Sequence, residues 1–229
     1  MIERFFHAES STHTYLIIRG NECVIIDPVL DDVDQYSDLI KEQNLKLAYA
    51  IDTHIHADHI TALGELRERH GCITVMGEQS QAACVSQPIQ CDDVIEFADL
   101  KIKALFTPGH TDDSYCYYME MDSMKYLFTG DTLLINGCGR TDFQNGSSYE
   151  LYNSLFTILR ELDSETIVLP AHDYNGKLQS TLGQEFENNP RLNFSNREEF
   201  IEFMDNLNLP DPKLMDIAVT ANKNCGISH

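Results

Sequence analysis

The chain has 229 residues, which suits one large domain or one domain with a short extension, and 42% of them are hydrophobic, which is enough to bury a core. Its formal net charge of −21 argues against nucleic acid and anionic membranes as partners. It has no apolar run near the roughly 18 residues of a transmembrane helix, and its N-terminus lacks the basic start and apolar stretch of a signal peptide. We therefore expect a cytoplasmic globular protein with an acidic, solvated surface.

Seven cysteines are scattered along the chain, and no two of them form a C-x-x-C pair. The count is odd and nothing indicates export, so we expect reduced thiols. Most are expected to be small buried apolar residues. For Cys138 and Cys225, the alternative is a sulfur-relay thiol or a thiol prone to oxidation.

The first half of the chain alternates between short β-rich runs and helical patterns. Strands are predicted over residues 14–19, 23–26, 47–51 and 73–76, and helices over residues 34–44, 60–69 and 78–85. Residues 20–22 are typical of a hairpin turn, and Gly71 is expected to cap the helix before it.

The second half contains a further group of strands, followed by helices. Strands are predicted over residues 94–97, 101–106, 114–119, 125–128 and 167–169, and helices over residues 148–160, 177–187 and 196–206. Since the strands fall into two groups, we expect an α/β (α+β) fold of two packed sheets with helices outside them. We expect residues 1–229 to form a single domain, in which residues 177–229 are a mostly helical C-terminal extension.

The stretch T-H-I-H-A-D-H, residues 53–59, directly follows the strand predicted over 47–51. His54 and His56 are two residues apart, so on an extended segment they project to the same side. Asp58 and His59 follow at the entry to a helix, where they can turn toward the same opening. A polar loop in water is the alternative, but so many ligand-type residues rarely cluster without a metal.

Three more predicted strands each end in one residue that could bind a metal. His110 follows residues 101–106, Asp131 follows residues 125–128, and His172 follows residues 167–169. Each of these alone could equally have a hydrogen-bonded structural role. Together with residues 53–59, they favour a metal site built where several strand ends converge.

These motifs, T-H-x-H-x-D-H, P-G-H-T, G-D-T and the late strand-end histidine, resemble the metallo-β-lactamase superfamily. The resemblance implies an αββα sandwich with the site at one edge of its two sheets. It also implies two metal positions, with Asp131 between them. The first would use His54, His56 and His110, and the second would use Asp58, His59 and His172.

The segment G-C-G-R-T-D-F-Q, residues 137–144, narrows the resemblance. Its first half is similar to glyoxalase II, and its second half is similar to the persulfide dioxygenases. Further matches to the persulfide dioxygenases lie at residues 170–176, 189–192, 206–210 and 221–226. With them the resemblance covers nearly the whole chain. The chain departs from that family at residues 222–224, where a more basic run is typical.

The persulfide dioxygenase resemblance implies one Fe(II) per chain, bound by His54, His110 and Asp131. Two histidines and one carboxylate form the facial triad of non-haem iron oxygenases. The remaining four ligand-type residues would support these ligands through hydrogen bonds. They are His56, Asp58, His59 and His172. The residues alone do not choose between this arrangement and a pair of zinc or iron ions.

The implied reaction is the oxidation of glutathione persulfide by O₂ and water to sulfite and glutathione. Glutathione carries two carboxylates, so a basic clamp is needed. Arg140 is the first candidate, and Tyr174 and Lys177 could also line the opening. One alternative is a thioesterase similar to glyoxalase II, and another is a non-catalytic persulfide or redox sensor. By analogy with the superfamily, a homodimer is possible.

Overall fold

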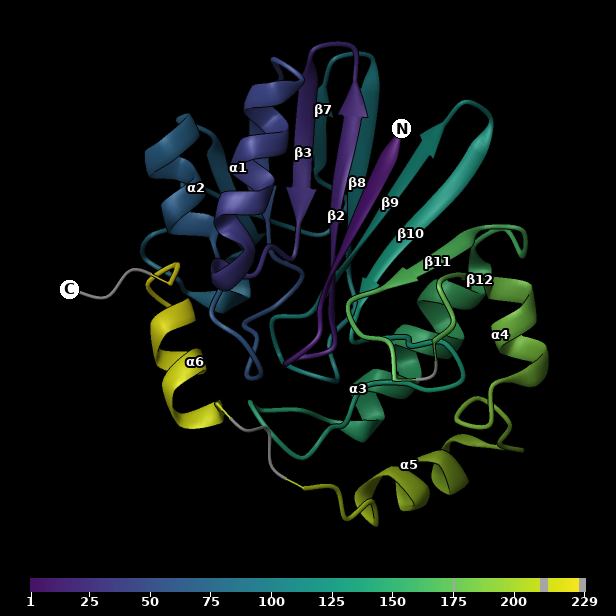
Figure 1. Cartoon of the computed structure of the whole chain (residues 1–229). Coiled ribbons are helices and arrows are strands. Elements are labelled where there is room, and N and C mark those ends of the chain that lie inside the picture. The colour runs from purple at the N-terminus through teal and green to yellow at the C-terminus, as the bar shows by residue number, and fades with distance from the viewer. Residues whose placement is uncertain (175, 211–213, 227–229) are drawn as a thin grey trace. The chain divides into compact units, whose positions relative to one another are not determined.

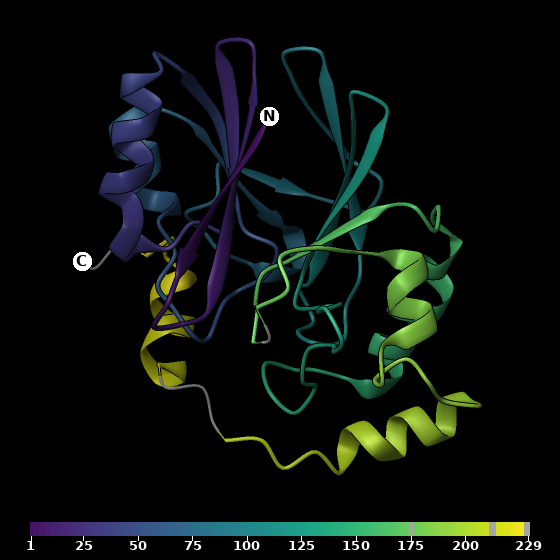
Figure 2. The same cartoon turned by 45° about the vertical axis from the view of Figure 1, so that its right-hand side comes forward.

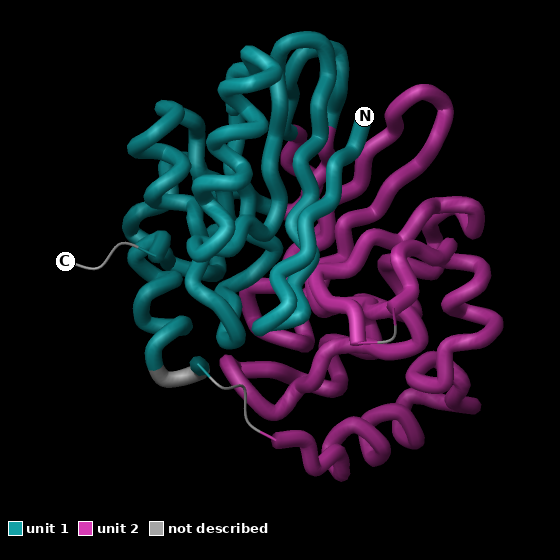
Figure 3. Tube along the Cα trace, viewed as in Figure 1, with its two compact units in different colours: residues 1–90, 95–101, 211–229 teal, residues 91–94, 102–210 magenta. Residues whose placement is uncertain are grey.

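A computed structural model of the chain describes residues 1–174, 176–210 and 214–226 (Figure 1). The chain divides into two compact units (Figure 3). The first unit comprises residues 1–90, 95–101 and 211–229, and the second comprises residues 91–94 and 102–210. Among the described residues, no helix is long and apolar enough to cross a bilayer.

The first sheet has six strands in the spatial order β1-β2-β3-β4-β5-β6. They are β1 (Ile2–His7), β2 (Thr12–Arg19), β3 (Glu22–Ile26), β4 (Lys46–Ile51), β5 (Ile73–Gly77) and β6 (Gln87–Ile89). Strands β1 to β3 pair antiparallel, and β3 to β6 pair parallel. Because β3 and β4 are parallel neighbours, the segments that follow them leave the sheet at the same edge.

The helices of the first unit follow from local signals in the sequence. Helix α1 (Val33–Glu42) buries Tyr36 and Ile40, and the Tyr36 ring meets the Phe5 ring edge-on at 4.9 Å between centroids. Helix α2 (Leu63–His70) ends at Gly71, whose φ of 67° is left-handed, as predicted for a glycine cap.

The second sheet has the order β12-β11-β10-β9-β8-β7, in which β10 and β11 pair parallel, whereas the pairs β8–β9, β9–β10 and β11–β12 are antiparallel. Its strands are β7 (Val94–Phe97), β8 (Leu100–Phe106), β9 (Tyr115–Met121), β10 (Met124–Gly130), β11 (Ile167–Pro170) and β12 (Ser180–Thr181). Helix α3 (Ser148–Asn153) continues through a π turn (Ser154–Ile158) and a 3₁₀ turn (Leu159–Glu161), so the helix predicted over residues 148–160 is confirmed.

Helices α4 (Leu182–Asn188) and α5 (Arg197–Asp205) complete the second unit (Figure 2). The Phe200 ring of α5 lies 5.6 Å from the Tyr152 ring of α3, so these two helices share one core. Side chains cap the starts of α3, α4 and α5 by accepting backbone N–H bonds. The caps are Ser147, Thr181 and Asn196.

Some predicted boundaries were wrong, for local reasons. The helix predicted over 177–187 begins only at Leu182, because residues 180–181 pair with β11 and Thr181 is the cap. The helix predicted over 78–85 is a single 3₁₀ turn, Glu78–Ser80, which ends at Gln81 with φ at 52°. Strands β1 and β6 and helix α6 (Met215–Asn222) were not predicted as elements.

The expectation that all seven cysteines are reduced thiols was also wrong. Cys84 and Cys225 form a disulfide, with their Cα atoms 6.0 Å apart and a sequence separation of 141. No sequence spacing reveals a pair so distant, because only the fold brings α6 back to the connection between β5 and β6. The other five cysteines remain thiols, and of these only Cys91 is exposed.

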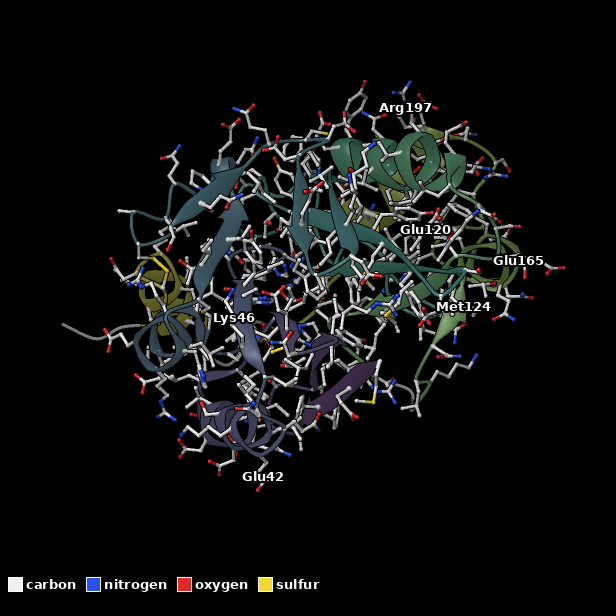
Figure 4. The ribbon with its side chains drawn as sticks, turned by 90° about the horizontal axis from the view of Figure 1, so that it is seen from above. Glu42, Lys46, Glu120, Met124, Glu165 and Arg197 are labelled. Carbon is white, nitrogen blue, oxygen red and sulfur yellow. A yellow bond between two sulfur atoms is a disulfide. The ribbon has the colours of Figure 1, made fainter. Side chains whose placement is uncertain are left out.

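The acidic residues lie largely at the surface, as the net charge predicts. Glu42 of α1 is exposed, and Figure 4 shows its side chain at the edge of the molecule. Lys46, also labelled there, forms an ion pair of 3.1 Å with Glu22. Exposed pairs of this kind contribute little to stability, so the two cores carry the fold.

Candidate metal centre

The loop between β4 and α2 gathers the first predicted cluster. His54, His56 and His59 are at most 2% exposed, although they lie on irregular backbone. The ring centroids of His54 and His56 are 4.2 Å apart, and those of His56 and His59 are 4.3 Å apart. His56, Asp58 and His59 can each offer one ligand atom within 4.8 Å of the others. The polar-loop alternative is therefore excluded, because these side chains are buried together.

One buried carboxylate, Asp27, organises this loop and was not among the predicted site residues. Asp27 follows β3, the parallel neighbour of β4, so it leaves the sheet at the same edge. Its Oδ1 accepts from the Thr53 N–H at 2.7 Å and from His56 Nε2 at 3.1 Å. Its Oδ2 accepts from the Thr53 hydroxyl at 3.1 Å. Its position just past an apolar strand was the signal in the sequence.

These hydrogen bonds decide which nitrogen of each ring carries its proton. The Thr53 hydroxyl donates to Asp27, so its oxygen accepts from His54 Nδ1 at 3.0 Å, and Nε2 of His54 keeps its lone pair. His56 donates from Nε2 to Asp27, so Nδ1 is the nitrogen left to face a metal. His59 donates from Nδ1 to Asp58 at 2.9 Å, so the lone pair of His59 is on its Nε2. A metal requires such neutral, oriented rings.

The charges around His56 suit a cation. Burial alone lowers the pKa of His56, but the adjacent Asp27 carboxylate, with Asp52 and Asp58, outweighs burial and raises it to about 10. Nδ1 of His56 is buried, makes no hydrogen bond within the described part of the chain, and lies 3.9 Å from Asp58 Oδ1. A bound metal ion can supply the positive charge that this environment favours.

In the second unit, the two other predicted histidines lie close to the predicted carboxylate, Asp131. His110 Nε2 lies 3.4 Å from Asp131 Oδ2, and His172 Nε2 lies 3.6 Å from Asp131 Oδ1. Two ligands that each lie about 2.1 Å from one metal are themselves about 3.0–3.4 Å apart at normal ligand angles. The His110–Asp131 pair therefore fits a shared ion. The two carboxylate oxygens of Asp131 face different histidines, so a bridging role also fits.

The segment G-C-G-R supports His110 and Asp131 through its backbone. His110 Nδ1 donates to the Arg140 carbonyl at 2.8 Å, which leaves the lone pair on Nε2, the nitrogen nearest Asp131. The Gly139 N–H donates to the Asp131 carbonyl at 2.7 Å. A Cβ on Gly139 would lie 2.3 Å from that carbonyl oxygen and 2.8 Å from the His110 ring. Only glycine fits there.

The three predicted substrate-binding residues have different surroundings. Arg140 uses four of its five N–H groups on the Asp142 carboxylate and on the carbonyls of residues 209 and 210. Its guanidinium also lies 4.1 Å from the Phe143 ring centroid. Tyr174 is 68% exposed and stacks on the His172 ring at 5.8 Å, and Lys177 is exposed.

Comparison with known proteins gives consistent matches. The metallo-beta-lactamase superfamily profile matches residues 8–82 and 89–172. A protein named persulfide dioxygenase ETHE1, mitochondrial, from Mus musculus is 44% identical over 230 residues, which cover 99% of this chain and 89% of that protein. The crystal structure of ETHE1 from Myxococcus xanthus has a TM-score of 0.95 at 45% identity and covers 99% of this chain and 100% of that one. A hydroxyacylglutathione hydrolase from Dictyostelium discoideum is 30% identical over 201 residues, 74% of each chain.

Replacing Gly139 with alanine is expected to displace His110 or Asp131 and to weaken metal binding by about 10- to 100-fold. Gly137→Ala is the matched control, since a Cβ there would meet only the Leu134 Cβ at 3.7 Å. Competition with a chromophoric chelator measures both affinities. Equal metal affinity in the two variants would contradict the role assigned to Gly139.

Cys138 is expected to resist alkylation in the folded protein. Burial raises the pKa of this thiol to about 12, so at pH 8 it carries almost no reactive thiolate. Exposed Cys91 should be labelled by iodoacetamide under the same conditions, and mass spectrometry of peptides distinguishes the two sites. Rapid labelling of Cys138 before unfolding would restore it as a candidate relay thiol.

Proposed function

The chain belongs to the metallo-β-lactamase superfamily and, within it, to the persulfide dioxygenases, and from this we propose that it oxidises glutathione persulfide to sulfite and glutathione. The predicted fold class, two mixed β-sheets flanked by helices, is confirmed by the same similarities. The observation that carries the proposed activity is similarity to persulfide dioxygenases over 99% of this chain.

We propose that one Fe(II) ion is bound by His54, His110 and Asp131. When bound, Fe(II) supplies the one-electron chemistry that lets O₂ react with a persulfide sulfur. The donor set supports this choice, because two neutral imidazoles and one carboxylate are typical of non-haem iron oxygenases. Thr53 and the Arg140 carbonyl each hold one of the two imidazoles in the required orientation.

The other four predicted residues are proposed to support the ligands and the charge of the site. They are His56, Asp58, His59 and His172. Asp27 holds the Nε2 proton of His56, and Asp58 holds the Nδ1 proton of His59. These residues would also complete a second metal position. If the chain were a thioesterase of the glyoxalase II type, the site would hold two zinc or iron ions.

Glutathione persulfide is proposed to bind beside Arg140, Tyr174 and Lys177. A persulfide is already largely anionic, so the reaction requires no general base. The task of these residues is to position the substrate and exclude bulk water. Arg140 is paired with Asp142, which reduces the charge available to a glutathione carboxylate. Its proposed contact therefore uses the remaining N–H donor or displaces part of that pair.

A thioesterase of the glyoxalase II type is the second candidate, favoured by the 30% identity to a hydroxyacylglutathione hydrolase. A non-catalytic persulfide sensor is the third, and persulfide turnover would exclude it. A cytoplasmic location and a homodimer are kept as proposals. The first is tested by fractionation, since the mouse relative is named as mitochondrial, and the second by light scattering.

The iron-loaded protein is expected to consume O₂ when glutathione persulfide is added at neutral pH, with sulfite formed in equal amount. Asp131→Asn should lose about 100-fold or more in kcat/KM and most of its iron, because the carboxylate ligand is removed. Asp122→Asn, at an exposed turn, is the control. Hydrolysis of S-lactoylglutathione without O₂ uptake, with iron confirmed in the protein, would favour the thioesterase instead.

Arg140→Ala is expected to raise KM for glutathione persulfide by about 10-fold while changing kcat less, since a charged hydrogen bond contributes about 1.5–3 kcal/mol. The matched control is Arg197→Ala, whose side chain lies at the surface in Figure 4 and stacks over Tyr149 at 4.9 Å. An unchanged KM would leave Arg140 with only its structural contacts to residues 142, 209 and 210.

A further inference from the structure

The end of α6 contacts the metal-binding loop through one buried side chain. Asn222 is 0% exposed, and its Oδ1 accepts from the Thr61 N–H at 2.9 Å. Its Nδ2 donates to the carbonyls of His56 and His59, both at 2.9 Å. All three bonds span more than 160 residues of sequence and lie within the first unit. One amide therefore holds the backbone of the histidine loop at residues 56, 59 and 61.

These bonds give a side-chain partner to three buried backbone groups of the loop. Residues 55–61 run through the loop without forming a helix or a regular strand. Buried backbone groups must find partners, and losing one is costly. The Asn222 side chain thus sets the path of the backbone from which His56 and His59 project.

The residues that follow Asn222 lie directly on the same loop. The Gly64 N–H at the start of α2 donates to the Cys225 carbonyl at 2.9 Å. Gly226 has φ at 75°, and a Cβ there would lie 2.0 Å from the Thr61 carbonyl oxygen. The C-terminal segment is therefore packed onto the loop too closely to accept a side chain at residue 226.

A disulfide joins this C-terminal segment to the connection between β5 and β6. Cys225 is fully buried, and its partner Cys84 is partly exposed in the connection between β5 and β6. The Arg67 guanidinium of α2 donates to the Cys84 carbonyl and helps to hold that connection in place. The bond joins the segment that carries Asn222 to a part of the unit outside the metal-binding loop.

We propose that residues 222–226 form a disulfide-locked clamp, in which Asn222 positions the metal-binding loop and the Cys84–Cys225 bond keeps it there. The proposal rests on the proposed metal function of that loop. Cys84 is partly exposed whereas Cys225 is buried, so a low-molecular-weight thiol would approach the bond from the side of Cys84.

The exchange requires two equivalents of thiol. A thiolate attacks Cys84 Sγ, forms a mixed disulfide, and releases Cys225 as a thiolate that takes up a proton. A second thiolate attacks the mixed disulfide, leaves as the oxidised thiol dimer, and frees Cys84. Two electrons pass from the two thiols to the protein disulfide. The clamp then holds the loop only through hydrogen bonds and packing, with no covalent bond.

The test compares Fe(II) affinity by chelator competition in the air-oxidised and dithiothreitol-reduced full-length protein. Reduction should weaken iron binding by about 10-fold, the lower end of the effect of removing a supporting contact. Cys84→Ser should show the weaker affinity without further response to dithiothreitol. Cys91→Ser, at an exposed thiol, should behave as the unmodified chain.

Asn222→Asp tests the clamp itself, because a carboxylate can accept from Thr61 but cannot donate to the two carbonyls. It should lose about 10- to 100-fold in iron affinity. The spectrum of its iron–nitric oxide adduct should also change, which a loss of stability alone would not cause. Asn224→Asp, on an exposed residue, is the matched control.

Two results would overturn the proposal. The first is seven reactive thiols in the unfolded, air-oxidised protein, which would exclude the disulfide. The second is iron affinity that is unchanged both by reduction and in Asn222→Asp. If Asn222→Asp fails to fold, the iron affinity of the unmodified chain before and after reduction still shows whether the disulfide supports the metal-binding loop. Neither readout uses persulfide turnover, so failure of the proposed reaction would be seen separately.

Discussion

The histidine loop depends on the buried carboxylate of Asp27. By accepting from the Thr53 backbone and hydroxyl and from His56, Asp27 fixes both the path of the loop and the protonated nitrogen of its rings. Asp27 also orients His54, because the Thr53 hydroxyl that donates to Asp27 accepts from His54 Nδ1. A buried carboxylate is costly unless it is fully hydrogen-bonded, and here each bond it accepts also orients a side chain or backbone group of the loop.

In the second unit, backbone groups rather than a carboxylate orient the ligand-type side chains. The Arg140 carbonyl accepts the His110 proton, and the glycine before it allows the chain to pass against both His110 and Asp131. Asp27 and Thr53 lie within two residues of the ends of β3 and β4, and Asp131 directly follows β10. Strands are rigid, so short segments that follow them hold ligands more accurately than long loops can.

Motif spacing predicted the ligand-type residues because each follows an apolar run that had to become a buried strand. It also predicted the cap at Gly71, where φ is positive. It missed Asp27 as a site residue, since a lone strand-end aspartate followed by proline is equally typical of a turn. The role of Gly139 was not predicted either, because its reason is a close approach to residues that are distant in sequence.

The sequence by itself determined the two sheets, most of their strands and helices, and the set of histidines and aspartates. Those features depend on local periodicity and on residue chemistry, which the order of residues records directly. The tertiary structure alone decided which nitrogen of each ring is presented, the pairing of Cys84 with Cys225, and the contact of Asn222 with the histidine loop. Each of these last two joins residues more than 140 positions apart, and only the path of the folded chain brings such residues within bonding distance.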